Sequence, residues 1–527
     1  MGNGIACCCL TLGLLAAAPV TGRAQSCSDP RLRNPRNYIT RLVRDDSIPS
    51  IAIAVALDGR TLCTEGFGYA DVAARAPASG QTRYAVASVA KPFVATGLML
   101  LVERGRVSLD ESANRYLPRA ARLIGRAAGA DRITIRHLLQ HRSGLPSPHV
   151  TRFLPGQAPL PAVAIHRYGV IVNPPDERYG YSNLGYGVLA LLSSTVAGKP
   201  YDQFLHDEVF SPLGLQQTTI EIGPRLSRPA ARLYDSENRV LPYYVFDEWG
   251  SGRIWSSAVD LVTFGLSQLG IPPATGRLVL ADSSRARMVQ DRRSTGTATG
   301  RYGLDWFYGL GWGGRDSSNV SPLWYGHDGG MPGSSADLKI LPGRRIVVVA
   351  LSNSDRAPTG ALTDSLVHAL VPKYAEMRRR DPVLIRKDEE SKPFTPTSAL
   401  LGHWHGRVAT WTGDVPFRLT VSADSSVWIR LGYRSTLKAT EVEYRDGQLT
   451  FDADARLDTP DLKRFPEHTL WFSLTLRGDS LSGAVTAYTP TNRVPSVALP
   501  AWVSVRRAPV NDATRRRSSL HLQRRPS

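Results

Sequence analysis

The sequence predicts an α+β protein in which an antiparallel sheet is flanked by helices and followed by a C-terminal all-β domain. Between residues 30 and 375, strand-like hairpin patterns stand at both ends and apolar helical stretches lie between them. This order favours one antiparallel sheet covered by helices over repeated parallel units. From residue 397 onward, apolar and polar residues alternate and turn signals recur about every ten residues, which is typical of a barrel or sandwich.

The domain at residues 30–375 is expected to begin and end with a β-hairpin. The first hairpin, "SIPSIAIAVALDGRTLCTEGFGYAD", turns at Asp58-Gly59, and the last, "SADLKILPGRRIVVVALSNS", turns at Pro342-Gly343. Between them, the apolar stretch "RYAVASVAKPFVATGLMLLVERG" predicts a helix of about 15 residues that stops at Gly105. A second apolar helix is expected in "YSNLGYGVLALLSSTVAGKP", with a Gly-Lys-Pro end.

The remaining segments are assigned from composition. Residues 1–24 read as a signal peptide, because an apolar run ends in small residues at the two positions that a signal peptidase reads. Residues 376–396 are charged and contain proline, which indicates a linker, and residues 397–507 form the all-β domain, expected as a lipocalin-like barrel. Residues 508–527 read as a basic disordered tail. The leader predicts a periplasmic or secreted protein, and whether it is cleaved or remains as an anchor stays open.

The net charge of +18 comes partly from that tail and partly from arginines spread over the chain. A basic helix with interleaved aromatic residues is lacking, so no nucleic-acid partner is expected. Peripheral association with a membrane surface or the cell wall stays open, as does the oligomeric state. The expected partner is a small-molecule or peptide substrate.

Cysteine and histidine usage gives little sign of a metal. Three of the five cysteines lie in the leader, and the other two, Cys27 and Cys63, form either one disulfide or two free thiols. His403 and His405 share a strand face without further ligands, which is weak evidence for zinc. We expect no metal and no cofactor.

Ser88 and Lys91 stand three residues apart at the start of the first predicted helix, where they share a face. The chain has 56 Arg and only 8 Lys, so a charge that served solubility alone would be expected to be Arg. A lysine here suggests a function for an amine that can lose its proton. Apolar surroundings favour the uncharged amine, which could take the Ser88 proton. A capping serine beside a surface lysine is the alternative. The second such pair, Ser435 and Lys438, lies on a predicted strand, where positions three apart face opposite sides.

Two further motifs follow in the chain. Tyr181-Ser182-Asn183 precedes the second helix about 90 residues later, and its phenol could carry a proton to a leaving group while Asn183 orients Lys91 or holds a substrate carbonyl. His327-Asp328-Gly329-Gly330 comes about 145 residues after that, and its glycines permit close backbone approach. Taken singly, Tyr181 and His327 also fit an ordinary loop tyrosine and loop histidine.

In this order, the S-V-A-K, Y-S-N and H-D-G motifs resemble those of the serine β-lactamase and penicillin-binding-protein superfamily. The chain looks most like the branch with class C β-lactamases, D-alanyl-D-alanine carboxypeptidases, D-aminopeptidases and related esterases. The resemblance spans residues 35–370 and includes "LLQHRSGLP" and "GSGRIWSSAVDLVTF".

The resemblance implies a role for each motif residue. Ser88 would be the acylated nucleophile, Lys91 its proton partner, and Tyr181 a general acid or base with Asn183 beside it. His327 would take the third-motif position, and Gly329 and Gly330 would lie at the substrate and oxyanion site, where the N–H groups of Ser88 and Gly330 hold the oxyanion. The expected activity is an exported serine hydrolase that acts through an acyl-enzyme on a small amide, D-amino-acid peptide or ester. The alternative is a non-catalytic penicillin-binding-protein-like binding or assembly protein.

The third motif departs from the Lys-Thr-Gly that is usual in class C β-lactamases, which points away from an efficient antibiotic-destroying enzyme. Asp328 would repel a substrate carboxylate if it faced the cleft, whereas strand alternation could turn it away. Arg142 stands where threonine is frequent in the family and adds a positive charge. The sequence leaves open whether this charge faces the cleft.

Overall fold

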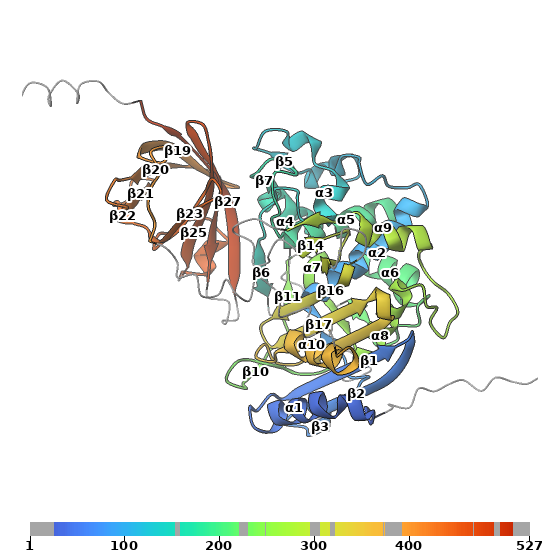
Figure 1. Cartoon of the computed structure of the whole chain (residues 1–527). Helices are drawn as coiled ribbons and strands as arrows, with labels where there is room; N and C mark the ends of the chain where they lie inside the picture. The colour runs from blue at the N-terminus through green and yellow to red at the C-terminus, as the bar shows by residue number, and fades with distance from the viewer. Residues whose placement is uncertain are drawn as a thin grey trace, which may run out of the picture.

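The computed structural model describes residues 26–152, 159–220, 230–247, 249–295, 306–316, 322–372, 374, 393–466, 468–489 and 496–509. The predicted leader therefore lies outside the described residues, as do most of the linker and the tail. Figure 1 shows a helix-and-sheet domain, blue to gold, beside a barrel-like domain in orange and red. The predicted α+β class with these two architectures is confirmed.

The first domain is built on a nine-stranded sheet in the order β13-β14-β15-β16-β17-β18-β1-β2-β3, in which every pair is antiparallel. Both predicted hairpins are confirmed. The first consists of β1 (Ser50–Leu57) and β2 (Arg60–Asp71), and the second of β17 (Ser334–Leu341) and β18 (Ile346–Ser352). The other strands are β3 (Ala76–Pro77), β13 (Arg293–Ser294), β14 (Trp306–Tyr308), β15 (Gly313–Asp316) and β16 (Pro322–Met331).

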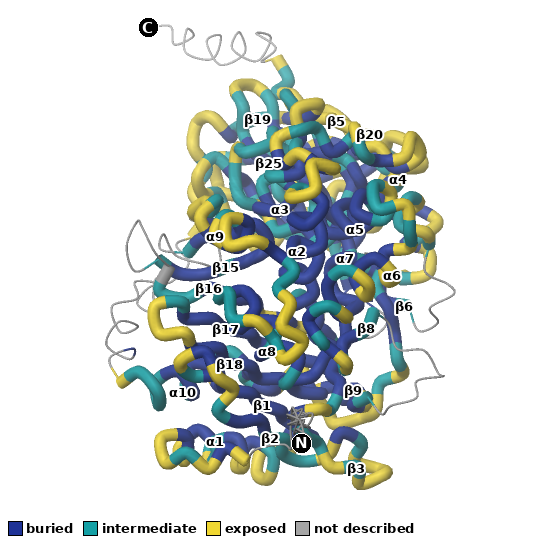
Figure 2. Tube along the Cα trace, turned by 90° about the vertical axis from the view of Figure 1, so that its right-hand side faces the viewer, coloured by how far each residue is buried: buried dark blue, intermediate teal, exposed yellow. Residues whose placement is uncertain are grey.

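Helices cover both faces of this sheet, which explains the continuous apolar runs of its central strands. Val348 and Ala350 pack into the cluster beneath α1 (Arg33–Arg44) and α10 (Thr359–Leu370). Val347 and Val349 point the other way, into the core with α2 (Ala90–Glu103), α5 (Asn183–Ala197) and α8 (Ala258–Gln268). The strands β1 and β18 accordingly lie in the dark-blue interior of Figure 2.

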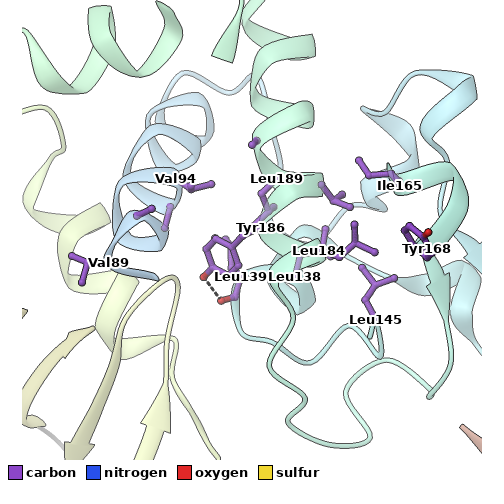
Figure 3. Close-up of a cluster of buried hydrophobic side chains, with 14 of the residues drawn as sticks. Val89, Val94, Leu138, Leu139, Leu145, Ile165, Tyr168, Leu184, Tyr186 and Leu189 are labelled. Carbon is purple, nitrogen blue, oxygen red and sulfur yellow. Dashed lines mark hydrogen bonds between the residues drawn. The ribbon is translucent and has the colours of Figure 1, made fainter. Parts of the chain in front are cut away.

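Both predicted apolar helices are confirmed and pack against each other in this core. The first is α2, and Gly105 beyond its end adopts a left-handed φ of 65°. The second is α5, whose C-cap Gly198 is likewise left-handed. Figure 3 shows Val94 of α2 near Tyr186 and Leu189 of α5, with the Tyr186 hydroxyl donating to the Leu139 carbonyl over 2.8 Å. This packing fixes the two helix starts, which carry the Ser88 and Asn183 motifs, relative to each other.

The second domain is an antiparallel sheet that curls nearly closed (Figure 1). Its strand order is β22-β21-β20-β19-β27-β26-β25-β24-β23. The bounds are β19 (Gly402–Thr410), β20 (Gly413–Val421), β21 (Val427–Leu431), β22 (Leu437–Lys438), β23 (Thr440–Arg445), β24 (Gln448–Ala453), β25 (Thr469–Arg477), β26 (Ser480–Tyr488) and β27 (Val497–Arg507). The rings of Phe417, Phe451 and Phe472 stack inside it, with centroids 4.7 and 5.2 Å apart.

The two domains share a sheet edge. Strand β6 (His149–Arg152) of the first domain pairs with β27 of the barrel on one side and with β11 (Val245–Phe246) on the other. Around this junction, Arg167 and Tyr168 bond Asp461, and Arg477 of the barrel bonds Glu177. The barrel is therefore attached to the first domain through a strand pair and through these side-chain contacts.

Of the alternatives for Cys27 and Cys63, the structure contains the disulfide, with the two Cα atoms 4.9 Å apart. Within the described part of the chain, no helix is both long and apolar enough to span a membrane.

Candidate active site

Ser88 lies where a short 3-10 turn, Ala87–Val89, leads into α2. Ala87 has a φ of +46°, a left-handed conformation that is unfavourable for a residue with a side chain and is found where surrounding structure holds it. Lys91 Nζ lies 3.0 Å from Ser88 Oγ, one helical turn away. The spacing of the first motif therefore brings the amine and the hydroxyl into contact.

Lys91 is fully buried. Its Nζ donates to Asn183 Oδ1 over 2.9 Å and to the Ser251 carbonyl over 3.2 Å, and it lies 4.7 Å from the centre of the Tyr181 ring. These oxygen partners, like Ser88, are neutral groups.

Tyr181 donates from its hydroxyl to Ser88 Oγ over 2.9 Å. Burial raises the pKa of Tyr181 well above its usual value, and the hydrogen bond with Ser88 offsets part of that rise. The phenol is therefore protonated at neutral pH and can donate its proton. Asn183 is placed beside it by the N-cap of α5, where Ser182 accepts from the Gly185 N–H over 3.0 Å.

His141 supports this arrangement and was missed as a site residue, although it stands in the quoted "LLQHRSGLP". Its ring lies 4.2 Å from the Tyr181 ring, between centroids, and its Nδ1 accepts from the Ser182 N–H over 3.0 Å. Burial, with Lys91 nearby, lowers the pKa of His141 well below its usual value. A neutral His141 thus holds the Tyr181-Ser182-Asn183 segment in place.

His327 lies near these groups but bonds to neither Ser88 nor Tyr181 in the described structure. Its Nδ1 lies 2.6 Å from the Asp328 carbonyl, which can only accept, so this nitrogen carries the proton. Nε2 then accepts from the Tyr308 hydroxyl over 2.9 Å. Burial lowers the pKa of His327 to about 4, so the ring is neutral near pH 7. Its ring centre lies 6.4 Å from that of Tyr181.

The two glycines of the third motif lie along the nucleophile turn. A Cβ at Gly329 would stand 2.2 Å from the Val86 carbonyl oxygen and 3.2 Å from the Ser88 nitrogen, so only glycine lets β16 approach this closely. A Cβ at Gly330 would meet nothing within 4 Å, because this residue borders open space next to Ser88. The edge of β16 thus forms one side of the space in which a carbonyl would react.

The structure resolves the orientation of two charges. Asp328 lies opposite Asp337 where β16 pairs with β17, so both side chains point to the face of the sheet that α10 covers. The Asp328 side chain is 71% exposed. His327 pairs with Leu338 and points to the opposite face. Arg142 is held by Asp176, with its Nε 2.5 Å from the carboxylate.

A cavity of about 490 Å³ opens at Ser88. Besides the serine, the residues that line it include Asn183, Ser251, Gly330, His149, Asp355 and Ser496. A neighbouring cavity of about 830 Å³ borders Tyr181, His327 and Asp328, and both aromatic and charged residues line it. Sequence reasoning missed His149 and Ser496, because strand pairing between the domains brings them here.

Among the described residues, no group of three or more His, Cys, Asp or Glu side chains is arranged to hold a metal. The His403 and His405 pair lies on the exposed side of β19.

Comparison with known proteins yields a family and a fold. The family model Beta-lactamase matches residues 35–372. Penicillin-binding protein 4 of Amycolatopsis lactamdurans is 29% identical over 357 residues, which cover 66% of this chain and 91% of the relative. Penicillin-binding protein 4* of Bacillus subtilis is 28% identical over 326 residues, 58% of this chain and 68% of the relative. The octameric penicillin-binding protein homologue from Pyrococcus abyssi has the same fold, with a TM-score of 0.56 at 20% identity over 88% of this chain and 99% of that one.

Proposed function

Because the chain belongs to the β-lactamase family, we propose that it is an exported serine hydrolase that forms an acyl-enzyme at Ser88 and hydrolyses a small amide, D-amino-acid peptide or ester. One observation carries the proposal: Ser88 Oγ lies 3.0 Å from the Lys91 amine and 2.9 Å from the Tyr181 hydroxyl. A nucleophile, a base and an acid within hydrogen-bond reach are what acyl transfer requires.

In the first step, Ser88 Oγ attacks the carbonyl carbon while its proton passes to the uncharged amine of Lys91. The N–H groups of Ser88 and Gly330 bind the oxyanion. The bond to the leaving group breaks as Tyr181 supplies a proton to the departing oxygen or nitrogen, and Lys91 returns a proton to the phenolate. In the second step, water attacks the ester at Ser88, and the acid product leaves as Ser88 regains its proton. His327, neutral and bonded to Tyr308, acts beside Tyr181 as a polar neighbour.

The charge around the cleft bears on the substrate. Among the described residues that line the Ser88 cavity, Asp355 is the only carboxylate and none is Lys or Arg. Among these described residues, a substrate carboxylate would meet one fixed anion and no fixed cation. This favours neutral or amine-bearing acyl groups over the carboxylate of a penicillin or a D-Ala-D-Ala terminus.

Export is supported by two features. The predicted leader precedes residue 25, and the Cys27–Cys63 disulfide is of a kind that persists in oxidising compartments. Intact mass of the protein recovered from periplasm and culture medium tests this. A full-length, reduced chain confined to the cytoplasm would contradict it.

Labelling of Ser88 tests the activity. The wild-type protein should gain the mass of one fluorophosphonate adduct, and Ser88→Ala should gain none. Ser435→Ala, which removes the serine of the other S-x-x-K pair in the barrel, is the matched control and should label like wild type. A panel of nitrocefin, D-Ala-D-Ala peptides, D-aminoacyl amides and p-nitrophenyl esters then assigns the substrate. No adduct with either fluorophosphonate or penicillin, and no turnover, would favour the non-catalytic binding protein instead.

A further inference from the structure

The junction between the two domains reaches the wall of the Ser88 cavity. Ser496, just before β27, donates from its N–H to Thr151 Oγ1 over 2.6 Å, and the Thr151 N–H donates to the Ser496 carbonyl over 3.1 Å. Both residues are buried, and Ser496 lines the cavity. A residue of the barrel is thus fixed, through Thr151, at the edge of the cleft.

Strand β6 is held as firmly on its other side. Its Arg152 forms an ion pair with Asp247 in which Nε and Oδ1 are 2.6 Å apart and both side chains are largely buried. Thr151 also pairs with Phe246 of β11, and Phe246 lines the same cavity. The wall of the cleft is therefore a short sheet that runs from Phe246 through β6 into the barrel.

His149 is the first residue of β6 and faces Ala498 of the barrel across the strand pair. It lines the Ser88 cavity, and none of the described residues forms a hydrogen bond with its ring. Burial lowers the pKa of His149 to about 4, so the imidazole is neutral near pH 7 and offers one donor and one acceptor. His149 is partly exposed, so a ligand that enters the cavity can hydrogen-bond to its ring.

We propose that His149, held in place by the barrel, binds the acyl part of the substrate by hydrogen bonding and so makes the barrel part of the substrate site. The inference rests on the proposed hydrolase function and adds to it the kind of acyl group that the site prefers. The ring selects acyl groups with an amide or amino substituent next to the reacting carbonyl, because such a group can donate to or accept from an imidazole. His149 touches substrate in this account, whereas Thr151 is a positioning residue.

The test compares two p-nitrophenyl esters of equal acyl length in the full-length protein, one with an α-acetamido substituent and one with an alkyl group in its place. In His149→Phe, which keeps the ring shape without its nitrogens, kcat/KM for the acetamido ester should fall about 3- to 10-fold, mainly through KM. The alkyl ester should change less than about twofold. His149→Gln, which keeps a donor and an acceptor, should restore part of the preference.

Two controls separate the possible failures. His166→Phe alters an exposed histidine of α4 (Pro161–Tyr168) and should leave both esters unchanged. Thr151→Val removes the hydroxyl that bonds Ser496 and should reduce the acetamido preference by a smaller factor, with a lower melting temperature. Equal loss on both esters, or none, in His149→Phe overturns the inference. A wild-type protein that fluorophosphonate does not label at Ser88 would instead overturn the hydrolase assignment.

Discussion

Two fully or almost fully buried lysines lie on opposite faces of the large sheet, and their surroundings differ in charge. Lys91 is 0% exposed and contacts Ser88, Asn183 and a backbone carbonyl. Lys339 is 5% exposed, bonds Asp364 and lies 4.8 Å from the Trp324 ring centre. Burial alone would lower the pKa of Lys339, but Asp337 and Asp364 raise it above its usual value.

The contrast shows that burial by itself does not prepare a lysine for proton transfer. Lys339 is paired with carboxylates and stays charged, which suits a structural role between β17 and α10. Lys91, on the side where the nucleophile lies, contacts a hydroxyl, a side-chain amide and a backbone carbonyl. The groups that contact the amine, rather than the depth at which it is buried, distinguish a candidate base from a structural cation.

The largest effect expected from this contrast is on turnover. Lys91→Met keeps the length of the side chain and removes the amine, so kcat/KM should fall about 10²- to 10⁴-fold, the range expected for loss of general acid–base catalysis. Steady-state hydrolysis of a p-nitrophenyl ester measures it, with the melting temperature as a check on folding. A folded Lys91→Met protein with near wild-type kcat/KM would remove Lys91 from the mechanism.

The second lysine should show the opposite response. Lys339→Met leaves the carboxylates of Asp337 and Asp364 buried without their cation, so the free energy of unfolding should drop by about 3–5 kcal/mol. Urea denaturation measures the drop, and kcat per folded molecule should remain within about threefold of wild type. A large loss of kcat with unchanged stability would show that the α10 face takes part in catalysis.

The neutral histidine on the Ser88 side should make stability sensitive to acid. The pKa of His327 is lowered to about 4 in the fold from an ordinary 6.5, so between these values the unfolded chain binds a proton that the folded chain does not. Its contribution is present above pH 6.5 and should fall by about 2 kcal/mol between pH 7 and pH 5. The free energy of unfolding of His327→Gln should lack this part of the decline. Parallel pH profiles for the two proteins would contradict it.

The smallest effect concerns two aspartates that differ in the cavity they line. Asp355→Asn should raise kcat/KM for a succinyl ester relative to a neutral ester by up to about fivefold, because it removes a charge from the Ser88 cavity. Asp328→Asn, on the α10 face, should change that ratio by less than about twofold. If Asp328→Asn gave the larger change, the carboxylate of the third motif would act on the reacting end of the substrate.

Sequence patterns were sufficient to predict the parts of the structure that depend only on residues close together in the chain. Ser88 and Lys91 meet because helical spacing puts residues three apart on one face, and both hairpins turn at the Gly-containing pairs that mark them. The family resemblance placed Tyr181 and Asn183 beside them, which no local pattern could do.

Apart from His141, which stands in the quoted "LLQHRSGLP" segment, the missed groups have no local signature. The Ser251 carbonyl bonds Lys91 through the backbone, so the residue type carries no information. Tyr308 and His141 act through ring contacts and tautomers that depend on three-dimensional packing. His149 and Ser496 come together only because β6 and β27 pair across about 345 residues of chain.

The shared strand edge also bears on how such proteins can diversify. A domain joined by a loose tether can be exchanged between relatives without consequence for its neighbour. Here an exchanged barrel would bring its own residue to the cavity and its own register for β6, so a recombinant chain would inherit an altered cleft along with the new domain. Successful natural or engineered chimaeras should therefore carry the His149–Arg152 strand and the barrel from the same parent.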